Sequence, residues 1–120
     1  MSMPSQHASR WLACCGALLA SAAVALSAYA AHGVAATVQP QLQLAAVFAF
    51  GHGLALAALA RGPLRRLAWA ALLALLAGTV LFAGGLVVAQ LCGLRARVAP
   101  FGGALLIAGW LLYAVDTSRK

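Results

Sequence analysis

The sequence predicts an all-α integral membrane protein, a four-helix up-down bundle formed by a single transmembrane domain over residues 1–120. Composition is the first reason: 65% of the 120 residues are hydrophobic and 8% are charged, against about 25% charged residues in an ordinary soluble domain. The second reason is that the apolar residues fall into four long runs. A chain this apolar cannot cover a water-exposed surface, so we expect a bilayer to be its solvent.

Each of the four runs is free of charged side chains. We predict helices over residues 11–31, 42–60, 67–91 and 98–115. At about 1.5 Å per residue, helices of roughly 18 to 25 residues cross a hydrocarbon core of about 30 Å and satisfy their backbone groups internally. The links between the runs are short, so consecutive helices should be antiparallel neighbours.

The first run has two interpretations, a cleaved signal peptide or a retained helix. Its residues 28–30 read Ala-Tyr-Ala, which resembles a signal peptidase site. The run is longer than the apolar core of about 7 to 15 residues in a signal peptide. Its small residues also recur at Gly16, Ala20, Ala23 and Ser27, a spacing that suits packing against another helix. We therefore expect a retained first helix.

Basic residues flank the runs and indicate orientation. One side of the predicted bundle has six of them and the other has two; the six are Arg10, Arg61, Arg65, Arg66, Arg119 and Lys120, and the two are Arg95 and Arg97. This asymmetry predicts a multi-pass membrane protein with both termini in the cytoplasm. Aromatic residues gather toward the same side, and we interpret them as interfacial anchors: Trp11, Trp69, Trp110 and Tyr113.

The net charge of +7 does not indicate a nucleic-acid partner. The basic residues are scattered at helix ends, and no recognised nucleic-acid motif is present. We expect membrane lipid as the surroundings, with a second copy or another membrane protein as a possible partner.

Groups able to carry out catalysis are scarce. The sequence has no Glu and a single Asp, Asp116, so paired-carboxylate catalysis within one chain is ruled out. It also lacks a zinc-spaced Cys/His cluster, a phosphate-binding glycine loop and the common hydrolase motifs. We expect no enzymatic activity, no metal and no cofactor.

His52 is the candidate functional residue, because an ionisable side chain near the middle of a span is costly and often functional. One interpretation is a neutral imidazole hydrogen-bonded inside the bundle, with Ser21 or Thr79 as its partner. A second is a proton-handling group in a homo-oligomeric transporter or channel. Metal or haem ligation is a third. His32, at the outer end of the first helix, suits the carbonyl end of the helix dipole, and it lies about 15 Å from the depth of His52, too far for a shared haem.

Glycines predict close helix packing. Lipid provides no hydrophobic drive between helices, so close backbone approach must provide packing energy. The candidates are Gly16, Gly78, Gly85, Gly102 and Gly109. The sequence leaves open whether these glycines form contacts within one chain or the faces of a dimer.

Four segments carry a resemblance to a family. They read GALLASAAVALSAYAAHGV, FAFGHGLALAAL, GTVLFAGGLVVAQLCG and APFGGALLIAGWLL, and together they resemble the small bacterial inner-membrane family filed as domain of unknown function 423. The resemblance covers roughly residues 11–115 and implies four spans with an uncleaved first helix. It brings no catalytic residue, because the family has no established activity. This chain departs from the family pattern at residues 82–87, where Phe-Ala-Gly-Gly-Leu-Val replaces Phe-Ser-Gly-Ser-Leu-Tyr.

The expected function is that of a small multi-pass inner-membrane protein with a structural or interaction role in the membrane. The alternative is a small homo-oligomeric transporter or channel that uses His52.

Overall fold

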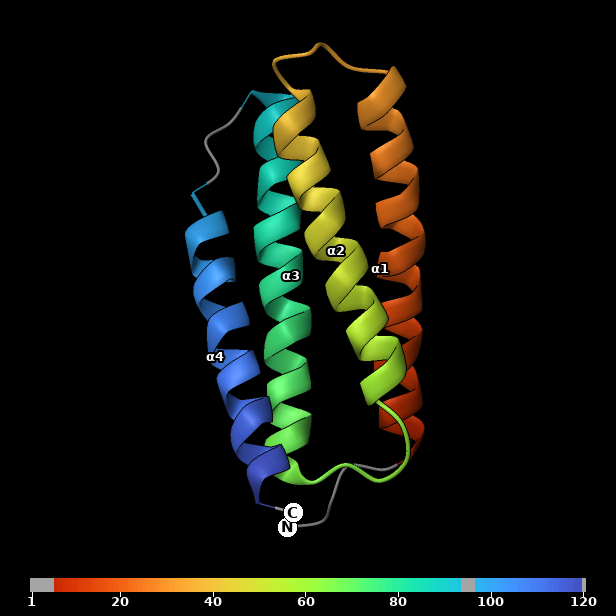
Figure 1. The fold of residues 1–120 in the computed structure, drawn as a ribbon, viewed down its shortest axis with the longest axis vertical. Coiled ribbons are helices and arrows are strands. Elements are labelled where there is room, and N and C mark those ends of the chain that lie inside the picture. The colour runs from red at the N-terminus through yellow and green to blue at the C-terminus, as the bar shows by residue number, and fades with distance from the viewer. Residues whose placement is uncertain (1–5, 94–96, 120) are drawn as a thin grey trace.

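A computed structural model of the protein describes residues 6–93 and 97–119, and these ranges contain four long helices (Figure 1). They are α1 (Gln6–His32), α2 (Gln39–Leu59), α3 (Arg66–Cys92) and α4 (Ala99–Ser118). Each is long and apolar enough to cross a membrane. α1 and α3 have 27 residues each, a length of about 40 Å. The predicted all-α four-helix class is confirmed.

The helix ends differ from the predicted ends by a few residues. α1 begins at Gln6, five residues before the predicted start at residue 11, and includes Arg10. A helix can continue past the hydrocarbon core, because charged residues are tolerated where the chain reaches the headgroups. Proline lies in the first turn of both α2 and α4, where its missing N–H costs no hydrogen bond. α3 ends at Cys92 and is capped by Gly93, whose φ of +71° suits glycine best.

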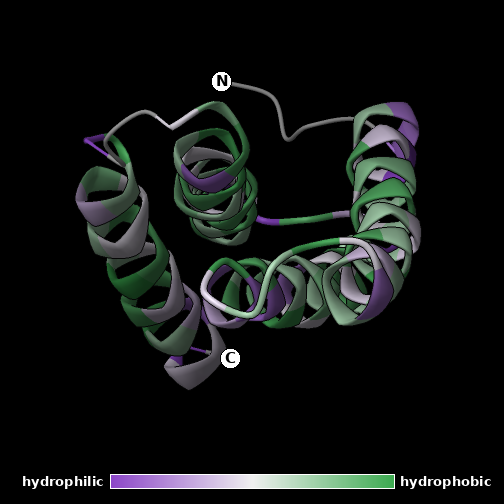
Figure 2. Ribbon diagram, turned by 90° about the horizontal axis from the view of Figure 1, so that it is seen from above, coloured by the Kyte–Doolittle hydropathy of each residue, from purple (hydrophilic) through white to green (hydrophobic). Residues whose placement is uncertain are grey.

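The four helices form two hairpins placed side by side. α1 packs against α2, α3 packs against α4, and α2 packs against α3 to join the hairpins. Viewed from above, α1 and α4 lie on opposite sides with α2 and α3 between them (Figure 2). Among the described residues, α1 touches α3 only marginally and no Cα atom of α1 lies within 8 Å of α4. The bundle is therefore open, and both outer helices have wide free faces.

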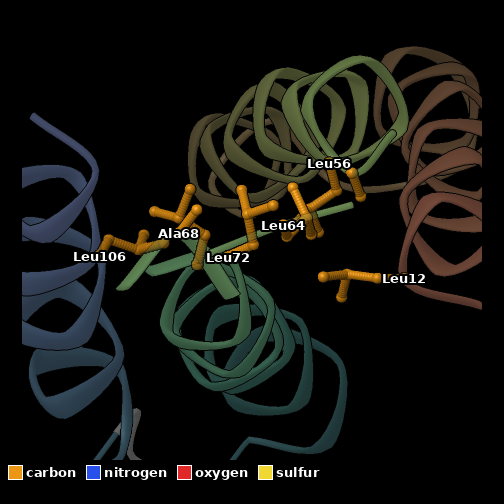
Figure 3. Packing of buried hydrophobic residues seen from close by; sticks show 8 residues of the cluster. Leu12, Leu56, Leu64, Ala68, Leu72 and Leu106 are labelled. Atoms are coloured by element: carbon orange, nitrogen blue, oxygen red, sulfur yellow. The ribbon is translucent and has the colours of Figure 1, made fainter. Parts of the chain in front are cut away.

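Two groups of buried side chains fill the interior. The leucine core lies toward the end of the bundle where α1 begins and α4 ends. Its side chains pack together between the helices (Figure 3), and they are Leu12, Leu56, Ala60, Leu64, Ala68, Leu72, Leu75 and Leu106. The alanine core lies toward the other end and consists of Ala23, Ala45, Ala49, Ala83, Leu86 and Ala99. Alanine allows helices to approach closely, whereas leucine fills the wider space between the hairpins.

Candidate functional site

A glycine pair closes the α1–α2 hairpin. A Cβ atom added at Gly53 would lie 2.6 Å from the carbonyl oxygen of Gly16, and one added at Gly16 would lie 2.5 Å from the carbonyl oxygen of Gly53. Both distances are far shorter than a van der Waals contact, so only glycine allows the two backbones to be this close. Gly16 is a packing residue that the sequence predicts, whereas Gly53 is one that sequence reasoning missed.

A longer series of glycines closes the α3–α4 hairpin. A Cβ atom at Gly102 would lie 2.7 Å from the carbonyl oxygen of Gly78, and one at Gly78 would lie 2.9 Å from that of Gly102. An added Cβ at Gly109 would lie 2.9 Å from Leu75 Cδ2. Gly85 is less tight, with 3.1 Å to a Val98 methyl group. All four glycines make contacts inside this chain, between α3 and α4.

His52 lies on α2 and is hydrogen-bonded at both ring nitrogens. Its Nδ1 is 2.8 Å from the backbone carbonyl oxygen of Phe48, and its Nε2 is 3.0 Å from the indole Nε1 of Trp110 on α4. A carbonyl oxygen only accepts and an indole N–H only donates. Nδ1 therefore carries the hydrogen and Nε2 accepts, which identifies a neutral Nδ1–H imidazole. A doubly protonated ring would point a second N–H at the Trp110 N–H and lose that bond.

Aromatic rings extend from His52 in both directions across three helices. The ring centroids are 4.5 Å apart for Phe82 and Phe48, 5.7 Å for Phe48 and His52, 5.8 Å for His52 and Trp110, and 6.2 Å for Trp110 and Tyr113. These separations are within the range of favourable aromatic contacts. We call these five residues the aromatic band. Because α2 belongs to one hairpin and α3 and α4 to the other, the band links the hairpins.

The proposed partners of His52 were wrong. Ser21 is exposed on α1, and the buried Thr79 donates its hydroxyl hydrogen to the carbonyl oxygen of Leu75, at 2.7 Å. Neither forms a hydrogen bond with His52. The imidazole is bonded to the Phe48 carbonyl oxygen and to Trp110 on α4, so it faces α4. His32 is exposed at the end of α1. The four candidate polar residues therefore do not form one site.

Trp110 was interpreted as an interfacial anchor, although it lies somewhat deep in its run for that role, and the structure gives it a hydrogen-bond partner in His52. His52 lies seven residues before the end of α2, and Trp110 lies eight residues before the end of α4. α2 and α4 run in the same direction, so both side chains are about 11 Å from the same end of the bundle. The depth of Trp110 in its run was the signal that could have suggested His52 as its partner.

A polar clamp joins the other end of the α1–α2 hairpin. The Ser27 hydroxyl donates to Gln43 Oε1 at 3.0 Å, and Gln43 Nε2 donates to the Ser27 carbonyl oxygen at 3.3 Å. Sequence reasoning placed Ser27 on a packing stripe and overlooked Gln43. Within a membrane, such interhelical hydrogen bonds typically contribute about 0.6 kcal/mol each.

Polar contacts also hold the end of the bundle that carries the first and last described residues. The Asp116 carboxylate is buried on α4, with its Oδ1 3.6 Å from Nε of Arg65, the residue before α3. The Ser9 hydroxyl, on α1, lies 3.2 Å from the Gly62 carbonyl oxygen in the α2–α3 link, to which it donates. These contacts attach both outer helices to the same link.

The arginines are distributed unequally between the two ends. Five lie at the end where α1 begins and one at the end where α3 finishes; the five are Arg10, Arg61, Arg65, Arg66 and Arg119, and the one is Arg97. Arg95 and Lys120, which the sequence analysis also counted, lie outside the described residues. This distribution matches the asymmetry found in the sequence.

The polar atoms of the described part of the chain are well satisfied. No buried side-chain nitrogen or oxygen there is without a hydrogen-bond partner. The same ranges contain no group of three or more His, Cys, Asp or Glu side chains that could hold a metal ion. Cys14, Cys15 and Cys92 are free thiols. Within the described ranges, the arrangement provides packing and hydrogen bonding.

Four apolar helices of membrane-spanning length, with flanking arginines, define a small multi-pass membrane protein. The sequence matches the family described as Protein of unknown function (DUF423) over residues 26–103. The chain belongs to this family, as the resemblance implied. The matched region contains His52 and the glycine pair Gly78 and Gly102, whereas Trp110 lies beyond it. No curated protein and no solved structure matches the chain.

Proposed function

We propose that the protein acts without catalysis, through the outward faces of its helices, which contact lipid or another membrane protein. The observation that carries this proposal is the contrast between a satisfied interior and an apolar exterior. No buried polar side-chain atom of the described residues lacks a partner. The outer helices meanwhile expose large apolar side chains, such as Leu18 on α1 and Ile107 on α4, at 64% and 65%.

The hydrogen bonds of His52 argue against the alternative of a proton-coupled transporter. A group that carries protons must exchange them with water and change its partners. His52 instead donates to Phe48 and accepts from Trp110, and the bond accepted from Trp110 requires the neutral ring. This supports a histidine whose role is to join α2 to α4.

We further propose that the protein lies in a bacterial inner membrane with both termini in the cytoplasm. The support is the excess of arginine at the end that carries the first and last described residues, combined with the preference of Lys and Arg for cytoplasmic flanks. Reporter fusions at either end would test this orientation: a fusion that is active only outside the cytoplasm would contradict it.

Photocrosslinking in the native membrane tests the main proposal. A photoreactive amino acid would replace Leu18 on α1 or Ile107 on α4, and Leu72, a core position that is fully buried, would be the control. We expect crosslinks to lipid or to one membrane protein from the two outer positions, and none from position 72.

A flux assay in proteoliposomes provides the opposing test. We expect wild-type protein and the His52→Ala variant to give the same proton flux as empty liposomes. A pH-driven flux that is present in wild type and lost in His52→Ala would overturn the proposal in favour of a transporter.

A further inference from the structure

A groove with two arginines lies at the end of the α1–α2 hairpin that carries the first described residues. It has a volume of about 440 Å³ and lies between the start of α1 and the end of α2. Its walls are formed by Gln6, Ser9, Arg10, Ala13, Ala57, Ala60, Arg61 and Gly62. We call it the arginine groove. None of these residues belongs to the aromatic band or to the Ser27–Gln43 clamp.

The two arginines of the groove have no anionic partner in the described part of the chain. The sequence contains one acidic side chain, Asp116, and its carboxylate is next to Arg65. Arg10 and Arg61 are both exposed and come from different segments, the first turns of α1 and the α2–α3 link. Two guanidinium groups facing one groove repel each other, and a shared anion removes that repulsion. Arginine also binds phosphate especially well, because its planar guanidinium group can donate two hydrogen bonds at once.

The position of the groove favours a lipid headgroup as the source of the anion. It lies beside the ends of membrane-spanning helices, and the neighbouring Trp11 is 65% exposed, as expected for a side chain at headgroup depth. The apolar part of the wall is formed by Ala13, Ala57 and Ala60, and these small side chains suit the glycerol and upper acyl region of a lipid. Basic pockets between helices at this depth are a recognised way to hold lipid headgroups.

We propose that the arginine groove binds the phosphate-bearing headgroup of an anionic membrane lipid. Arg10 and Arg61 donate to the phosphate oxygens from two sides, and the alanine wall contacts the apolar part of the same molecule. The bound lipid joins the start of α1 to the end of α2 at the headgroup level. This proposal is independent of what the outward faces of the helices contact.

Native mass spectrometry of the delipidated, full-length protein tests it, with phosphatidylglycerol as the probe. We expect one tightly bound lipid on wild type. The Arg10→Gln/Arg61→Gln variant should bind it about 25-fold more weakly, because each arginine near a membrane surface contributes roughly fivefold to the affinity for an anionic lipid. The Arg66→Gln/Arg119→Gln variant is the matched control, because it loses the same charge from exposed positions at the same end, outside the groove. Its affinity should change by less than about threefold.

A second variant tests the groove without changing its charge. Ala57→Leu keeps both arginines and fills part of the space, so it should also weaken binding. Circular dichroism of each variant verifies the fold before binding is compared.

Three results would overturn the proposal. The first is equal affinity of the Arg10→Gln/Arg61→Gln variant and wild type for phosphatidylglycerol. The second is equal binding of phosphatidylcholine, which carries the same phosphate without net charge. The third is full displacement of the lipid by millimolar inorganic phosphate, which would identify a free-phosphate site instead of a lipid site.

Discussion

The contacts inside each hairpin differ in kind from the contacts between the hairpins. Inside the hairpins, backbone meets backbone: Gly16 faces Gly53 in α1–α2, and Gly78 faces Gly102 in α3–α4. Between the hairpins, side chains bridge a wider space. The leucine core lies there, and Phe48, Phe82 and Tyr113 of the aromatic band pack against it. The two kinds of contact make different demands on the sequence.

This difference indicates which parts of the molecule resist change. A backbone contact admits only glycine, so a single added methyl group must push the helices apart. A side-chain contact can repack, and its hydrogen bonds are modest in energy. We therefore expect each hairpin to behave as a rigid unit and the joint between the hairpins to be the weaker interface.

The largest effect is expected inside the α3–α4 hairpin. Gly102→Ala should lower the free energy of unfolding by about 2 to 3 kcal/mol, because the new Cβ would lie 2.7 Å from the Gly78 carbonyl oxygen and would overpack the interface. Gly103→Ala is the control on the same helix, since its Cβ would meet nothing closer than 3.8 Å. Reversible unfolding in mixed detergent micelles measures both. Equal stability of the two variants would contradict the account.

The α1–α2 hairpin offers the same comparison two residues apart on one helix. Gly53→Ala should cost about 2 kcal/mol, because its Cβ would lie 2.6 Å from the carbonyl oxygen of Gly16. The Cβ atom added by Gly51→Ala would have no neighbour within 4 Å. Alanine is also more favourable than glycine inside a helix, by up to about 1 kcal/mol. The control should therefore equal or exceed wild type in stability. A loss in Gly51→Ala as large as that in Gly53→Ala would show that the helix tolerates neither change.

The joint between the hairpins should be affected less by the loss of its hydrogen bond. Trp110→Phe keeps an aromatic ring and removes the N–H that donates to His52 Nε2. We expect a loss of about 1 kcal/mol. A double-mutant cycle with His52→Leu isolates the interaction, and its coupling energy should be roughly 0.6 to 1.5 kcal/mol. A coupling energy of zero would mean that the bond contributes nothing to joining α2 and α4.

A similar but smaller effect is expected at the Ser27–Gln43 clamp. Ser27→Ala removes the hydroxyl that donates to Gln43 Oε1 and leaves the bond from the amide to the Ser27 carbonyl oxygen. The loss should be about 0.6 kcal/mol. Ser21→Ala is the control, because Ser21 is an exposed serine on the same helix. If both serine variants lose the same stability, the clamp is not the cause.

The smallest effect is expected at the ion pair. Asp116→Asn removes the charge that attracts Arg65, whose side chain is 42% exposed. Water can solvate the released guanidinium, so the loss should be less than about 0.5 kcal/mol. The loss should shrink in high salt, because salt screens exposed charges. A large, salt-independent loss would indicate that Asp116 has another role in packing.

The fold could be predicted from the sequence because the bilayer restricts the choice so strongly. Four charge-free runs of spanning length allow only four helices, and short links make neighbours antiparallel. The start of α1 at Gln6 could not be located, because its apolar run begins after Arg10 while the helix continues through it. Hydrophobicity marks the hydrocarbon core and leaves the helix ends outside it undefined.

The site was less predictable because rotation of α2 about its axis is invisible in the sequence. Ala45, Ala49 and Leu56 form a stripe with either His52 or Gly53, since both satisfy spacings of three and four residues. Gly53 is the buried member, and it faces α1. His52, about 100° further around the helix, is left to face α4. Whether His52 or Gly53 faces α1 can be decided only when the neighbours of α2 outside its own hairpin are known.

Nitrogen-15 NMR of His52 in bilayers tests most directly whether this histidine is a neutral link between the hairpins. The account predicts the Nδ1–H tautomer at neutral pH, with an Nε2 signal that shifts in Trp110→Phe and stays unchanged in Trp69→Phe. An Nε2–H tautomer, or an Nε2 signal that does not respond to Trp110→Phe, would contradict it.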